Sequence, residues 1–158
     1  MIVMNITKHF CATTYIIDPL TRETLFLWHP KLQTWLPPGG HIETNEEPLE
    51  AAIREIKEEI GINTVEFIPK TKVLEKKIDN RASYLELPHF IIKEQITDHH
   101  YHLDMIFFAK VLKKDFVSPE GHILKWFNLN QMKADNSIFP NVKVLAEYGM
   151  TILNPKIT

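Results

Sequence analysis

Apolar residues recur at helical spacing between Leu49 and Ile60, and the pattern predicts an amphipathic helix. The residues of this stripe, which we expect to be buried, are Leu49, Ala52, Ile53, Ile56 and Ile60. Gly61 follows directly and suits the left-handed backbone conformation that ends many helices. The helix therefore has a predicted buried face and a predicted end.

Apolar and β-branched segments predict the strands of a sheet. The two clearest are Phe10–Ile17, with a hairpin partner at Thr24–Trp28 beyond the turn at Asp18-Pro19, and Tyr101–Val111. Weaker patterns predict strands at Thr64–Phe67, at Lys72–Ile78, within Tyr84–Ile96 with a break near Pro88, and at Ile123–Leu129. One face of Tyr101–Val111 changes from polar to apolar along its length, as expected for a strand that begins beside a wet cleft.

Two further helices are expected near the end of the chain. A short one covers Asn130–Ala134, and a longer one begins at Pro140, a residue suited to a first helical turn. Its predicted buried stripe consists of Val142, Leu145, Ala146 and Met150. The sequence contains no repeat, low-complexity stretch or linker, so we expect residues 1–158 to form one α/β domain.

Composition places the chain among globular proteins, with 44% hydrophobic and 24% charged residues. The net charge of −2 gives no basic footprint, so nucleic acid is not an expected partner. A single cysteine, Cys11, allows no internal disulfide and fits a reducing compartment. The start, MIVMNITKHF, has no signal-peptide pattern, and no apolar run approaches the length of a membrane span. The expected location is the cytoplasm.

Three glutamates give the predicted helix a chemical character. Glu55, Glu58 and Glu59 stand at i, i+3 and i+4 and so share an arc of about 100°. Like charges at this spacing destabilise a helix, whereas hard divalent cations bind clustered carboxylates. We expect Arg54, which lies off the arc, to pair with Glu50 and Glu58 at i±4. A metal site explains the clustering better than a solvated helix face does.

The stretch Gly40–Ile62, GHIETNEEPLEAAIREIKEEIGI, resembles the signature of the Nudix hydrolase superfamily, G-x5-E-x7-R-E-U-x-E-E-x-G-U with U aliphatic. Every specified position of the signature is filled. The matching residues are Gly40, Glu46, Arg54, Glu55, Ile56, Glu58, Glu59, Gly61 and Ile62. Elsewhere the resemblance is general. It implies a Nudix-like α/β/α sandwich, with a mixed β-sheet between helices.

The resemblance also implies an activity and roles for individual residues. The activity is metal-dependent hydrolysis of a diphosphate bond in a nucleoside diphosphate linked to another group, with Mg²⁺ or Mn²⁺ as cofactor. Glu58 and Glu59 would be the principal metal ligands, the Gly40 carbonyl a further ligand, and Glu55 a ligand or base. Arg54 would hold the glutamates in position and Glu46 would support the geometry of loop and helix. The loop Pro37-Pro38-Gly39-Gly40, directly before the signature helix, is expected to form part of the site.

The general base remains open between Glu55, Glu120, Asp104 and Asp115. Glu120 is the candidate suggested by Nudix enzymes that add a carboxylate from a loop outside the signature, because it lies six residues before Trp126 and just ahead of a late strand. The other reading of Glu120 is a solvated loop residue.

Several polar residues outside the signature are candidates for substrate contacts. His41 follows Gly40 and is expected to line the site. His100, His102 and Asp104 alternate along a strand, a spacing that admits a zinc set, a polar strand end beside a cleft, or contacts with the leaving group. A polar strand end is the favoured interpretation, because zinc needs a fourth ligand that the sequence does not supply. His102 and Asp104 remain candidate substrate-binding residues.

Two functional alternatives accompany hydrolysis. A Nudix-like sensor would bind a nucleotide without turning it over, but such domains frequently lose signature glutamates. Isomerisation of an isoprenoid diphosphate is disfavoured because Cys11 stands in no recognisable catalytic motif. The substrate is open between small nucleotide derivatives and capped or triphosphorylated RNA, with small molecules favoured by the acidic charge. Tyr101–Val111 and the last helix are candidate surfaces for a homodimer.

Overall fold

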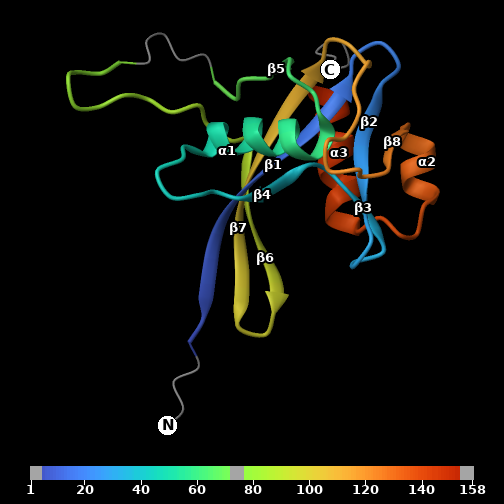
Figure 1. Cartoon of the computed structure of the whole chain (residues 1–158), viewed down its shortest axis with the longest axis horizontal. Coiled ribbons are helices and arrows are strands. Elements are labelled where there is room, and N and C mark those ends of the chain that lie inside the picture. Colours follow the sequence, from blue (N-terminus) through green and yellow to red (C-terminus); the bar gives the residue numbers. More distant parts are fainter. Residues whose placement is uncertain (1–4, 72–76, 154–158) are drawn as a thin grey trace.

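The computed structural model describes residues 5–71 and 77–153, and its centre is a mixed sheet (Figure 1). The two long strands β1 (Thr7–Asp18) and β7 (His100–Val111) pair in parallel, from Thr7 beside His100 to Ile17 beside Lys110. All other pairings are antiparallel. This mixed sheet was expected from the sequence.

Six shorter strands extend the sheet on both sides of the central pair. On the β1 side are β2 (Glu23–His29), β3 (Thr34–Leu36), β4 (Gly39–His41) and β8 (Leu124–Phe127). On the β7 side are β5 (Val65–Phe67) and β6 (Phe90–Thr97). Strand β6 begins two residues after Pro88, as a proline that cannot donate a ladder hydrogen bond requires. The strand predicted at 72–78 falls mainly on residues 72–76, outside the described residues.

Helices cover both faces of the sheet (Figure 1). The signature helix consists of α1 (Pro48–Glu55) and a π-helical turn, η1 (Ile56–Ile60), and it packs on one face. The short helix α2 (Leu129–Ala134) and the final helix α3 (Pro140–Ile152) pack on the other. The alternation of side chains along β1 divides it between these layers: Ala12 and Ile16 contact the signature helix, whereas Tyr15 and Ile17 join the α3 core. The α/β/α sandwich is confirmed.

The predicted buried stripes are mostly correct, with one error in the signature helix. All four residues predicted for α3 are buried, as are Ala52, Ile56 and Ile60. Ile53, however, is 49% exposed. The helix packs on the sheet through the small residues Ala51 and Ala52, which turns Ile53 about 100° away from the centre of the contact. No helix among the described residues is long and apolar enough to cross a membrane.

Candidate active site

The glycine strand β4 lies against the carboxylates of the signature helix. The Gly39 amide donates a hydrogen bond to Glu59 Oε2 at 2.9 Å. A Cβ atom added at Gly40 would lie 2.2 Å from Glu55 Oε1, closer than real Cβ atoms approach. A side chain at position 40 would therefore displace the Glu55 carboxylate, which occupies that space. The sequence predicted a site-forming loop here, and this contact gives its steric reason.

Arg54 ties this helix to the loop before it. Its guanidinium donates to Glu46 at 2.8 and 3.0 Å, to Glu55 at 2.7 Å, to Glu58 at 3.1 Å and to the His41 carbonyl at 3.0 Å. The Glu46 carboxylate, with Glu55 and Glu58, raises the pKa of Arg54 and keeps the side chain charged.

The predicted pairing of Arg54 with Glu50 is wrong. The Glu50 carboxylate accepts a hydrogen bond from the Glu47 amide and so caps the start of α1 instead.

The signature helix ends in a π-helical turn, and its three glutamates have different surroundings. The Gly61 amide reaches back to the Ile56 and Lys57 carbonyls, and Gly61 adopts a left-handed φ of 82°. Glu55 and Glu59 contact β4, but the Glu58 side chain is 49% exposed and borders a cavity on the outer side of the helix. Single π turns inside helices are frequent at functional sites. The three carboxylates therefore do not have equivalent surroundings.

The loop after β7 is fixed to the end of this helix. Ser118 Oγ donates to the Glu59 carbonyl at 2.5 Å and accepts from the His122 amide at 3.0 Å. Gly61 packs so closely on this loop that an added Cβ would lie 2.2 Å from the Val117 carbonyl oxygen. These contacts position Glu120 beside the signature helix.

Glu59, Glu120 and His122 each offer one potential ligand atom, and these atoms lie within 4.8 Å of one another. His122 Nε2 contacts Glu120 Oε2 at 3.0 Å. The sequence had singled out Glu120 but missed His122, whose only signal was its place two residues after Glu120. The group that the described residues form does not contain Glu55, Asp104 or Asp115, the other candidate general bases, and it does not contain Glu58.

The site concentrates negative charge. Burial, followed by repulsion from Glu55, Glu120 and Glu58, raises the pKa of the Glu59 carboxyl to about 7, although the Gly39 amide opposes the shift. Burial also raises the pKa of Glu55. Arg54 contacts Glu46, Glu55 and Glu58 and offsets little of the negative charge at Glu59. The arrangement therefore favours a bound cation.

A cleft of about 750 Å³ opens on the α3 side of β1 and β7, and Gly39 and Gly40 form part of its wall. The three candidate substrate-binding residues, His41, His102 and Asp104, also line it. The sequence missed other lining residues because they come from β6 and the start of α3: Glu94, Phe139 and Asn141. This cleft therefore joins the glycine strand to the polar end of β7.

Asp104 is 6% exposed and is held by one hydrogen bond, from Thr13 Oγ1 to Oδ2 at 2.7 Å. Its other oxygen, Oδ1, has no hydrogen-bond partner among the described residues. Burial, together with Glu94, raises the pKa of this carboxyl to about 7. Asp104 is thus equipped to hold a proton in the wall of the cleft.

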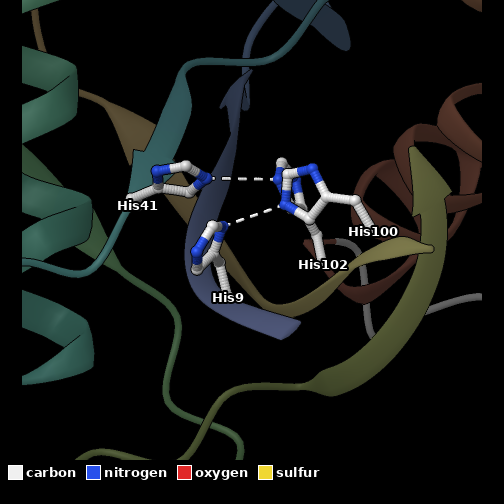
Figure 2. Close-up of side chains that lie close together, drawn as sticks. All are labelled: His9, His41, His100 and His102. Carbon is white, nitrogen blue, oxygen red and sulfur yellow. Dashed lines mark hydrogen bonds between the residues drawn. The ribbon is translucent and has the colours of Figure 1, made fainter. Parts of the chain in front are cut away.

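His102 and His100 do not form a ligand set with Asp104. They gather instead with His9 of β1 and His41 of β4 (Figure 2). Asp104 is bonded to Thr13 and is not a member of this group. Burial, with the neighbouring histidines, lowers the pKa of His102.

Comparisons with known proteins identify similar sequences and structures. The family model described as the NUDIX domain matches residues 8–148. A structure titled as a hydrolase of the NUDIX family from Clostridium perfringens is 32% identical and covers 93% of this chain and 99% of its own, with a TM-score of 0.81. An Ap4A hydrolase of C. elegans, solved as a binary complex, is 20% identical with a TM-score of 0.67; it covers 92% of this chain and 97% of its own and shows the shared fold.

Curated proteins match over shorter segments. An RNA pyrophosphohydrolase of Bartonella henselae is 53% identical over 38 residues, which are 24% of this chain and 22% of that protein. The curated matches span only 10% to 22% of the relatives' own lengths.

Proposed function

Because this chain belongs to the NUDIX family of hydrolases, we propose that it hydrolyses the diphosphate bond of a nucleoside diphosphate joined to another group, with Mg²⁺ as its cofactor. The observation that carries this proposal is the set of carboxylates gathered against β4: Glu55 on Gly40, and Glu59 bonded to the Gly39 amide within reach of Glu120. Gly39 and Gly40, which contact this set, also form part of the wall of a cleft large enough for a nucleotide-sized ligand.

The donor set fits the divalent ions that Nudix hydrolases generally use. Carboxylate and carbonyl oxygens suit Mg²⁺ and Mn²⁺; Glu55 lies against Gly40 and Glu59 binds the Gly39 amide, and the Gly40 carbonyl would be a further ligand. Bound there, the ion would offset charge on the phosphates and lower the pKa of a bound water. The half-exposed Glu58 carboxylate, which Arg54 holds at 3.1 Å, would complete the set.

We assign the general base to Glu120 among the open candidates. Its side chain is 51% exposed, so water can reach it, and His122 contacts its carboxylate at 3.0 Å. Glu55 is less suited because its side chain is only 13% exposed and its carboxylate is already engaged by Arg54 at 2.7 Å, so water reaches it less easily. Glu120 would take the proton of the attacking water, and Arg54 would act as a positioning residue that holds Glu55 and Glu58.

The cleft provides contacts for the rest of the substrate. His41 and His102, whose Nε2 atoms face each other at 3.2 Å, would donate to phosphate oxygens through Nδ1, and protonated Asp104 would donate to a polar group of the leaving half. Small nucleotide derivatives are the proposed substrates. Nucleic acid is not a proposed partner, because the net charge of −2 is not the basic excess that drives binding to nucleic acid. The cytoplasm stays the expected location.

The test measures phosphate or nucleotide release from a panel of nucleoside diphosphate derivatives with Mg²⁺, with Mn²⁺ and with a chelator. Wild type is compared with Glu58→Gln, Glu59→Gln and Glu120→Gln. The matched control is Glu66→Gln, an exposed glutamate that pairs with Lys110 on β7. We expect metal-dependent turnover that falls at least about 100-fold in the site variants and persists in the control.

Turnover that survives Glu58→Gln and Glu59→Gln unchanged would refute the proposal. Metal-dependent ligand binding without turnover across the panel would favour a nucleotide sensor instead.

A further inference from the structure

Four histidines from three strands converge beside the cleft, and two of them, His41 and His102, line it (Figure 2). His9 comes from β1, His41 from β4, and His100 and His102 from β7. Adjacent imidazole rings are 4.8 to 4.9 Å apart between centroids around a closed circuit of the four, and the diagonal from His9 to His102 measures 6.4 Å. Such a circuit places four nitrogen ligands around one point.

The nitrogen atoms are already near the spacing of a tetrahedral metal site. His41 Nε2 lies 3.2 Å from His102 Nε2, and His100 Nε2 lies 2.9 Å from His9 Nδ1. Each ring offers one nitrogen within 4.8 Å of the other three. Zinc with four nitrogens at 2.0–2.1 Å requires separations of about 3.3–3.4 Å, so the widest pair needs to close by no more than about 1.5 Å. Rotation of exposed imidazoles can supply that movement.

We propose that His9, His41, His100 and His102 form a binding site for Zn²⁺ that is distinct from the carboxylate site. The two sites differ in chemistry: imidazole nitrogens suit Zn²⁺ and related transition metals, whereas Mg²⁺ takes oxygen ligands. All four ligands are side chains of the sheet's own strands, and His9 and His41 are exposed, so the ion has a path from solvent.

The proposed ion would cross-link strands that form the hydrolytic site. His41 is the residue after Gly40, and its carbonyl accepts a hydrogen bond from Arg54 at 3.0 Å. Coordination of His41 would fix the end of β4 to β1 and β7, at the wall of the cleft that His41 and His102 share. We expect bound Zn²⁺ to stabilise this end of the sheet, independently of any turnover.

The test titrates Zn²⁺ into the full, untagged chain by calorimetry, with excess Mg²⁺ present to occupy the carboxylate site. Co²⁺ serves as a second probe, since its visible absorption is intense in a tetrahedral site and weak in an octahedral one. The variants are His9→Ala and His100→Ala. The matched control is His99→Ala, which removes an exposed imidazole beside His100 that lies outside the group of four.

Wild type and His99→Ala should bind one equivalent of Zn²⁺, show the tetrahedral Co²⁺ spectrum and gain thermal stability with Zn²⁺. His9→Ala and His100→Ala should bind Zn²⁺ at least 100-fold more weakly, with normal circular dichroism. The proposal is overturned if wild type takes up no Zn²⁺ in excess Mg²⁺, which would leave two hydrogen-bonded histidine pairs. It is also overturned if uptake survives both histidine variants and is lost in Glu59→Gln, which would place the ion among the carboxylates.

Discussion

Gly40→Ala tests the close contact between the glycine strand and the signature helix. The new Cβ would lie 2.2 Å from Glu55 Oε1 and 2.7 Å from its Cδ, roughly 1 Å inside ordinary contact. The carboxylate must therefore leave its position. Gly40 has an ordinary negative φ, so the substitution adds no backbone strain and its effect is steric.

The expected cost follows from what Glu55 loses. Displacement breaks the hydrogen bond from Arg54 at 2.7 Å, a charge-assisted bond worth about 1.5–3 kcal/mol when buried and less here because Arg54 is partly exposed. We expect Gly40→Ala to lower the free energy of unfolding by about 1 kcal/mol. A carboxylate misplaced by about 1 Å should also lower kcat/KM by about 100-fold.

A double-mutant cycle with Glu55→Ala separates this contact from other effects. Urea denaturation and kcat/KM are measured for wild type, both single variants and the double variant. Once Glu55 is truncated the added methyl meets no carboxylate, so Gly40→Ala should cost little further stability or activity. Additive losses in the double variant would show that Glu55 does not occupy the space beside Gly40 in solution, and the reasoning would fail.

Two further predictions concern Glu59 and Gly61. Without metal, the free energy of unfolding should fall as pH rises from about 4.5 to 7 and beyond, because the raised pKa of Glu59 makes the folded state bind more protons than the unfolded state in this window. Glu59→Gln keeps an acceptor for the Gly39 amide and should recover up to about 3 kcal/mol of the free energy of unfolding at pH 8, while abolishing turnover. Denaturation curves of chelator-treated protein over a pH series measure this free energy. An unchanged pH slope in the variant would contradict the raised pKa of Glu59. Gly61→Ala places a Cβ on a residue with φ 82°, 2.2 Å from the Val117 carbonyl oxygen, so it should lower the free energy of unfolding by at least about 1 kcal/mol. Because it also displaces the loop that carries Glu120, it should reduce kcat more than it changes KM. Wild-type kinetics in a destabilised Gly61→Ala protein would show that the loop position is unimportant for catalysis.

The sequence by itself determined the elements whose periodicity is strong. The signature helix, its end at Gly61, the long strands β1 and β7 and the buried stripe of α3 were all predictable, because local spacing of apolar residues decides which face of an element is buried. The signature also pointed to the glutamates and to Gly40, but the sequence predicted a loop where Gly39–His41 forms strand β4 by pairing with β1. Ile53 was misassigned because the width and centre of a buried face depend on what packs against it, here through two alanines.

Only the tertiary structure decided which side chains meet. Glu120 and His122 reach Glu59 because Ser118 binds the end of a helix about 60 residues earlier in the chain. His9, His41, His100 and His102 come together because β1 pairs in parallel with β7 and antiparallel with β4, a register that no local pattern encodes. The sequence showed His100 and His102 at alternating positions, but it did not show which residues could join them as further metal ligands. The sheet supplied those ligands, since strand pairing brings together residues separated by about 90 positions in the chain.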